Sequence, residues 1–186
     1  MENTIHTTAL VHPEAKLGEN CTVGPFSIIG PNVVLGNNCT VHSNVVLDGH
    51  LNAGNDNEFF QFCSIGAPPQ DLTYSGEPTS VEIGNKNIFR EYVSIHRGTV
   101  KDRKITTIGN ECLLMAHVHI GHDVIVGDNC VFANSVNLAG HVKIGDRSIV
   151  GGGTQISQFV SLGRGAYIGG AAAIDRDIPS FCTSYG

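Results

Sequence analysis

The chain has 186 residues, of which 41% are hydrophobic, as is ordinary for a single globular domain. Its formal net charge of −6, without a run of lysines and arginines, excludes the basic face on which nucleic-acid binding depends. No apolar run approaches the roughly 20 residues of a membrane span, so we expect no stable membrane insertion. The N-terminal stretch MENTIHTTAL has neither the basic start nor the apolar core of a signal peptide, and we therefore expect a cytoplasmic protein.

From Val11 onward, every sixth residue is apolar, in a series with two interruptions. No helical period competes with it, so short strands separated by corners are predicted. Three strands make a coil of about 18 residues, and stacked coils are spaced by about 4.8 Å. We predict one all-β domain over residues 1–186, a parallel β-helix built from hexapeptide repeats. The apolar series comprises Val11, Leu17, Val23, Ile29, Leu35, Val41, Leu47, Ala53, Phe59, Ile65, Ile83, Phe89, Ile95, Ile108, Leu114, Ile120, Val126, Phe132, Leu138, Ile144, Val150, Ile156, Leu162, Ile168 and Ile174.

A second column of small or β-branched residues lies two positions before the apolar one. Small thiols pack well in a core, and no two cysteines have the CxxC spacing of a zinc ribbon or redox pair. We predict buried free thiols at the five cysteines in this column, which are Cys21, Cys39, Cys63, Cys112 and Cys130.

Glycine often follows the apolar position directly, where the chain must turn a corner. Because glycine adopts positive φ without steric cost, we predict a positive φ at these glycines. They are Gly18, Gly24, Gly30, Gly36, Gly54, Gly84, Gly109, Gly127 and Gly145.

Two segments break the repeat, residues 67–79 (APPQDLTYSGEPT) and residues 97–104 (RGTVKDRK). We predict that both are loops extruded from the solenoid. Loops held by a rigid scaffold often carry function.

The stretch HVHIGHD at 117–123 places three histidines within six positions. His122 lies two residues after a core position, and Gly140 and Gln158 have the same phase one and two coils later. A vertical column is therefore predicted, with His122 and Gln158 about 9.6 Å apart. In such a column a histidine takes a proton from an acceptor while a glycine N–H stabilises an oxyanion, which suits acyl transfer. Asp123 is a candidate for orienting this machinery.

Two other interpretations of the histidines remain open. Histidines on the outside of a solenoid are often plain surface residues. Three histidines also bind catalytic zinc with one open position, as in hexapeptide-repeat carbonic anhydrases, where the ligands are spread over coils and chains. The compact HVHIGH spacing does not by itself create a tetrahedral site, so we expect no metal and no cofactor.

The stretch HVHIGHD, together with QDLTYSGEPT, SIHRGTV, NLAGHV and GPFSIIGP, closely resembles the UDP-N-acetylglucosamine acyltransferase family, and the resemblance extends over nearly the whole chain. It implies a left-handed β-helix and a homotrimer with active sites between subunits. It also implies the first reaction of lipid A synthesis, in which an (R)-3-hydroxyacyl chain passes from acyl carrier protein to the sugar 3-hydroxyl of UDP-N-acetylglucosamine.

By position, the resemblance implies that His122 is the general base, that Asp123 assists it and that Gly140 supplies the oxyanion N–H. Gly170 matches the family's acyl-chain ruler, where a small residue leaves room for a longer chain. The residues implied to surround the nucleotide sugar, with His96 functional in a less defined way, are Gln70, Asp71, His96, His119, His141 and Gln158.

This sequence departs from the family at two positions near the expected site. Thr73 stands where a lysine is common, and Ser157 stands where a histidine is usual. We also expect residues 1–186 to lack the family's C-terminal helical domain, which carries arginines for the nucleotide phosphates and basic residues for acyl carrier protein. Charge-assisted contacts to phosphate are strong, so weaker binding of the UDP-sugar is expected.

Two alternatives to the family reaction stay open at this point. One is an enzyme with the same histidine chemistry but another acceptor, such as a UDP-amino sugar, or an acyl-CoA donor. The other is a non-catalytic β-helix that binds a nucleotide sugar or only oligomerises.

Overall fold

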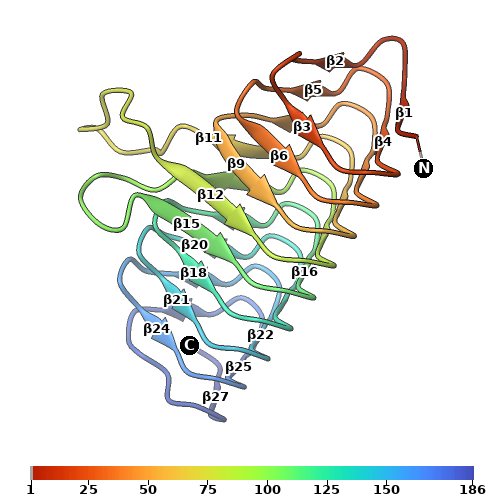
Figure 1. Ribbon diagram of the computed structural model, residues 1–186. Coiled ribbons are helices and arrows are strands. Elements are labelled where there is room, and N and C mark those ends of the chain that lie inside the picture. Colours follow the sequence, from red (N-terminus) through yellow and green to blue (C-terminus); the bar gives the residue numbers. More distant parts are fainter. Residues whose placement is uncertain (1) are drawn as a thin grey trace.

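The computed structural model describes residues 2–186, which form a three-sided column of stacked coils (Figure 1). Every pair of hydrogen-bonded strands is parallel, and no helix occurs among the described residues. This part of the chain accordingly has no helix that is long and apolar enough to cross a membrane. The predicted all-β architecture is confirmed.

Three sheets form the sides of the column, and successive strands pass from sheet A to B to C. Sheet A consists of β1 (Thr4–Ile5), β4 (Thr22–Val23), β7 (Thr40–Val41), β10 (Glu58–Phe59), β13 (Ile88–Phe89), β16 (Leu113–Leu114), β19 (Val131–Phe132), β22 (Ile149–Val150), β25 (Tyr167–Ile168) and β27 (Thr183–Ser184). Sheet B consists of β2 (Leu10–Val11), β5 (Ile28–Ile29), β8 (Val46–Leu47), β11 (Ser64–Ala67), β14 (Ser94–His96), β17 (His119–Ile120), β20 (Asn137–Leu138), β23 (Gln155–Ile156) and β26 (Ala173–Ile174). Sheet C consists of β3 (Lys16–Leu17), β6 (Val33–Leu35), β9 (His50–Ala53), β12 (Ser80–Ile83), β15 (Ile105–Ile108), β18 (Ile125–Val126), β21 (Lys143–Ile144) and β24 (Ser161–Leu162).

The strand register follows the predicted coil length. Thr22 pairs with Thr40 in the next coil, which is the 18-residue offset that three hexapeptides give. The offset is longer only where a loop is inserted, as between Glu58 and Ile88. Residues of equal phase therefore stand above one another along the column.

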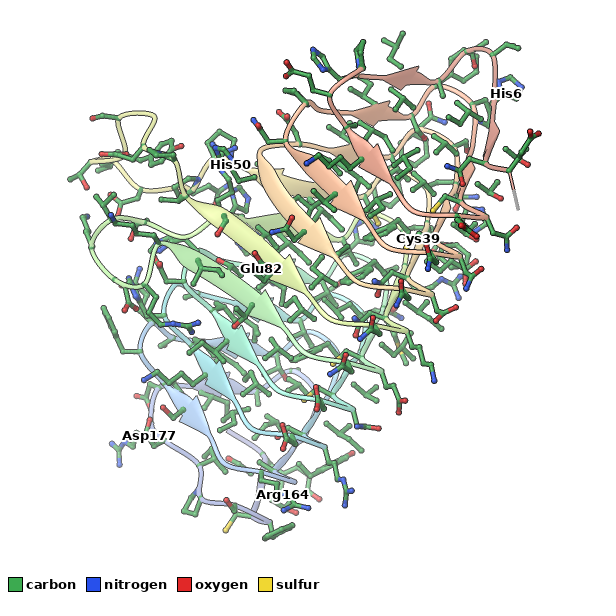
Figure 2. All side chains as sticks on the ribbon, in the orientation of Figure 1. His6, Cys39, His50, Glu82, Arg164 and Asp177 are labelled. Atoms are coloured by element: carbon green, nitrogen blue, oxygen red, sulfur yellow. The ribbon has the colours of Figure 1, made fainter. Side chains whose placement is uncertain are left out.

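The predicted inward columns form the core. The apolar series is buried except for Val11 and Leu17, which are half-buried at the N-terminal end. The five cysteines of the second column are buried free thiols, and burial raises the pKa of Cys39 to about 11 and that of Cys63 to about 12. By contrast, Glu82 lies on the outer face of sheet C (Figure 2).

The prediction for the corner glycines was wrong. None of the nine has a positive φ. After all of them except Gly30, the positive φ occurs two residues later, at non-glycine residues such as Asn38 and Glu111. Glycine is required because the coils approach closely at this point. A Cβ on Gly109 would lie 2.5 Å from Asp128 Oδ1 and 2.6 Å from the carbonyl carbon and oxygen of Gly127.

Side-chain amides and carboxylates cap the corner that follows sheet C. From Asn37 to Asp146 the residue after the glycine is Asn or Asp, and its Oδ1 accepts the N–H of the equivalent residue one coil before. The N–H of Asn37 donates to Asn55 Oδ1 and that of Asn55 donates to Asn85 Oδ1, both at 2.7 Å. The N–H of Asn110 donates to Asp128 Oδ1 at the same distance. This ladder satisfies backbone donors that no strand pairs.

Both predicted loops extend from the same edge of the column (Figure 1). Residues 68–79 connect β11 to β12, so Ala67, assigned to the loop from the sequence, belongs to a strand. Residues 97–104 connect β14 to β15 as predicted. Arg97 Nη2 donates to Tyr74 Oη at 2.8 Å, which ties the two loops together.

We expect Gly109→Ala to destabilise the fold by about 1–3 kcal/mol, because its Cβ would press on the backbone of the next coil. Glu111→Ala is the control, since Glu111 has the positive φ but an exposed side chain, and it should change the free energy of unfolding by less than about 0.5 kcal/mol. Chemical denaturation of both variants checks this. Equal losses would contradict the steric explanation.

Candidate functional site

The predicted column of His122, Gly140 and Gln158 lies at the corner that leads from sheet B to sheet C. The strands before this corner pair in register, β17 with β20 and β20 with β23, so the three residues follow one another in adjacent coils. They share a cavity of about 290 Å³. Three more of the predicted site residues line the same cavity, namely Gln70, His96 and His119.

His122 and Asp123 form a hydrogen-bonded pair. The Nδ1–H of His122 donates to Asp123 Oδ2 at 2.9 Å, since an ionised carboxylate can only accept. In the neutral imidazole this tautomer leaves Nε2 with a free lone pair. The side chain of His122 is 10% exposed, so this nitrogen is accessible while the ring is fixed.

The carboxylate of Asp123 is fully buried and is held by the second loop. It accepts hydrogen bonds from the N–H of Thr99, at 2.9 and 3.0 Å, and from Thr99 Oγ1, at 2.7 Å. The N–H of Asp123, at a φ of 60°, donates to Thr106 Oγ1 at 2.8 Å. Bonds to a buried charge stabilise it and fix its position, so Thr99 determines where His122 points.

The imidazole of His122 occupies the space that a side chain at Gly140 would fill. A Cβ at Gly140 would lie 2.6 Å from His122 Cε1 and 2.7 Å from Nε2, so any other residue would displace the ring. Gly140 is buried, and its N–H donates to no acceptor among residues 2–186. The Asn110 N–H occupies the equivalent position at another corner and is capped by a side chain. Next to Nε2 there is thus an unused backbone donor.

Two histidines from sheet B form another part of the cavity wall. His119 Nδ1 lies 2.8 Å from Ser94 Oγ, and its ring contacts that of His96 edge-on at 5.2 Å. His96 Nδ1 donates to the carbonyl of Pro68 in the first loop at 2.6 Å. Burial, reinforced by the nearby His96, lowers the pKa of His119. His119 is therefore neutral at pH 7 and acts as a hydrogen-bonding group.

A second cavity, of about 430 Å³, adjoins the first and shares Gln70, His122 and Gln158 with it. Predicted residues Asp71 and His141 line this second cavity, as does Thr73.

His141 is oriented by contacts on three sides. Its Nδ1 donates to Asp102 Oδ2 at 2.8 Å. Its ring stacks on Phe159 at 4.5 Å and meets His122 edge-on at 5.0 Å.

Not every highlighted residue lies at this corner. His117, in the same short stretch as His122, is on the corner between sheets A and B, where it stacks on Tyr92 at 4.7 Å. Gly170 is an exposed residue at that corner and lines neither cavity. The three histidines of HVHIGH therefore do not form one cluster.

The donor set does not favour a catalytic metal. Donor atoms of His122, Asp123 and His141 lie within 4.8 Å of one another. However, the oxygens of Asp123 already accept bonds from Thr99 and His122, which leaves two imidazoles. Catalytic zinc sites use three protein ligands.

Sequence reasoning missed Thr99, Lys101 and Asp102, which contact Asp123, Asp71 and His141. The sequence showed only that they lie in a predicted loop. Loop residues stand outside the six-residue repeat, so their contacts cannot be deduced from their position in it.

Comparison with known proteins first defines the class. A family model described as bacterial transferase hexapeptide (six repeats) matches residues 14–49 and 105–140. A second, described as hexapeptide repeat of succinyl-transferase, matches residues 123–158. The repeats are thus those of the hexapeptide-repeat transferases.

Solved structures narrow this class. LpxA from Acinetobacter baumannii is 48% identical with a TM-score of 0.97, and the match covers 98% of this chain and 70% of that chain. UDP-N-acetylglucosamine O-acyltransferase (LpxA) from Moraxella catarrhalis is 43% identical with a TM-score of 0.97, over 98% and 71%. The chain belongs to the UDP-N-acetylglucosamine acyltransferase family, and its β-helix is left-handed, as the resemblance implied.

A curated relative from Saccharophagus degradans, acyl-[acyl-carrier-protein]--UDP-N-acetylglucosamine O-acyltransferase, is 48% identical over 122 residues. The match covers 66% of this chain and 47% of the relative. The chain thus matches about half the length of that protein.

We expect Thr99→Val to slow acyl transfer about 10- to 100-fold, because it removes a hydrogen bond to a buried carboxylate worth about 1.5–3 kcal/mol. The effect should fall on kcat, since His122 loses its fixed orientation while the binding residues stay in place. Thr99→Ser, which keeps the hydroxyl, should restore most of the rate. Steady-state kinetics of both variants decide, and a Thr99→Val enzyme with the wild-type kcat would rule out this role.

Proposed function

We propose that the protein transfers an (R)-3-hydroxyacyl chain from acyl carrier protein to the 3-hydroxyl of UDP-N-acetylglucosamine, the first step of lipid A synthesis. The observation that carries this proposal is the fixed Nε2 of His122 beside the uncapped N–H of Gly140. A base and an oxyanion donor in contact are the two requirements of acyl transfer. Family membership supplies the substrate class.

In the proposed mechanism, His122 Nε2 takes the proton of the acceptor hydroxyl as its oxygen attacks the thioester carbonyl. The carbonyl oxygen becomes an oxyanion and accepts the N–H of Gly140. When the intermediate collapses, the carbon–sulfur bond breaks and the leaving thiolate receives the proton from His122. Asp123 stabilises the imidazolium between these steps, because it already accepts the Nδ1–H. No cofactor is required by this sequence of steps.

The other cavity residues are assigned to substrate binding. Acceptor hydroxyls and amides need hydrogen-bond donors and acceptors, which His119, His141 and Asp71 offer around the two cavities. Gln70 and Gln158 lie in both cavities and suit the nucleotide part, and His96 closes the wall beside the first loop. Gly170 stays a proposed acyl-chain ruler, in which case the acyl chain runs toward the corner between sheets A and B.

Neither alternative gains support from a specific contact. The buried carboxylate of Asp123 accepts three hydrogen bonds, one of which fixes the tautomer of His122. A non-catalytic binding module has no need for this arrangement. A changed acceptor or an acyl-CoA donor would use the same machinery, so activity screens with several acceptors and thioesters separate these cases.

We expect His122→Ala to reduce acyl transfer by about 10²-fold or more with the fold retained, because the ring lies at the cavity surface and its loss leaves no core void. His117→Ala is the matched control, five residues away on another corner, and it should stay within a few-fold of wild type. Turnover of UDP-N-acetylglucosamine with a carrier-protein thioester is measured alongside thermal unfolding. Similar activity losses in both variants would argue against His122 as the base.

We also propose a cytoplasmic homotrimer. Five apolar side chains stand above one another on the outer face of sheet A, an arrangement that association would cover. Ile88, Ile149 and Tyr167 are the exposed members, and Leu113 and Val131 lie between them in register.

Sedimentation equilibrium should therefore give a mass of about three chains at micromolar concentration. A fully active monomer would contradict the proposal.

A further inference from the structure

The two loops meet in an ion pair. Lys101 Nζ donates to both oxygens of Asp71, at 2.8 and 3.0 Å. The N–H and Oγ1 of Thr73 also donate to Asp71 Oδ1, at 2.8 and 2.9 Å. These donors, Lys101 foremost, hold the pKa of Asp71 well below its usual range. Asp71 is thus ionised, and its carboxylate holds the ammonium group of Lys101 in position.

Lys101 lines the second cavity, which also reaches His122. Its side chain is 49% exposed, whereas that of Asp71 is 11% exposed. An ammonium has three N–H donors, and the carboxylate occupies two of them. Lys101 is also the one lysine or arginine among the described residues that line either cavity.

We propose that Lys101 binds the diphosphate of the nucleotide sugar, a role that rests on the proposed function. A nucleotide diphosphate carries negative charge into a protein whose own net charge is −6, so a cation at the cavity is required for tight binding. Asp71 positions the ammonium without removing its last donor. The second loop thereby supplies the positive charge that Thr73 in the first loop lacks.

Position 73 allows a test by relocation of the charge. The hydroxyl of Thr73 and the ammonium of Lys101 both donate to Asp71 Oδ1, so the two positions adjoin the same carboxylate. Introducing Thr73→Lys into a Lys101→Met background should therefore return a cation to the same place.

Calorimetric titration with UDP-N-acetylglucosamine tests the proposal on four proteins: wild type, K101M, K101M with T73K, and R103M. Arg103 is an exposed residue of the same loop that lines neither cavity, so R103M loses the same charge elsewhere. We expect about 10- to 100-fold weaker binding by K101M, near wild-type binding by R103M, and recovery in the double variant. N-acetylglucosamine without the diphosphate should not distinguish K101M from wild type.

The outcomes separate this inference from the proposed function. A wild-type protein that does not bind the UDP-sugar would contradict the proposed function itself. Wild-type binding with an unchanged K101M, an equal loss in R103M, or no recovery in the double variant would overturn the role of Lys101 alone. Both members of the pair lie in surface loops, and in K101M the N–H and hydroxyl of Thr73 still donate to Asp71, so this variant should fold normally. Thermal unfolding of each variant verifies this.

Discussion

Each coil must bring its backbone within hydrogen-bonding distance of the coils on either side, and the rest of the molecule depends on this constraint. It leaves no room for a side chain after each sheet C strand. At Gly109, for example, a Cβ would collide with the carbonyl group of Gly127. The turn itself is completed two residues later, where Glu111 has a φ of 57°. Because every coil repeats these steps, residues that are 18 apart in the sequence become neighbours in space.

The same constraint produces the proposed oxyanion donor. At corners such as those of Asn110 and Gly140, the N–H two residues after the apolar position has no strand to accept it. After sheet C, side chains such as that of Asp128 accept this N–H, whereas at Gly140 the donor is left free and buried. An unpaired buried donor is costly, so it gains most from a ligand that brings negative charge. In the proposed mechanism, this donor stabilises the oxyanion while His122, which lies beside it, acts as the base.

Periodicity predicted the fold and the column of His122, Gly140 and Gln158, because phase alone determines which residues stack. It could not predict the corner geometry, since the close approach at glycine and the positive φ two residues later are set by distances that no sequence period contains. Nor could it find Thr99 or Asp102, whose partners depend on the path of an inserted loop. The hand of the coil came from the family resemblance.

The buried thiols give the column a property of their own. Each of the five lies at a different height in the stack, and burial keeps those of Cys39 and Cys63 protonated at neutral pH. All five are buried, so in the folded protein thiol reagents meet only the exposed Cys182 among the cysteines of residues 2–186. A solenoid holds each coil mainly through its neighbours and can open from its ends. As the chain unfolds, the order in which the buried cysteines begin to react with a thiol reagent therefore reports the order in which the coils separate.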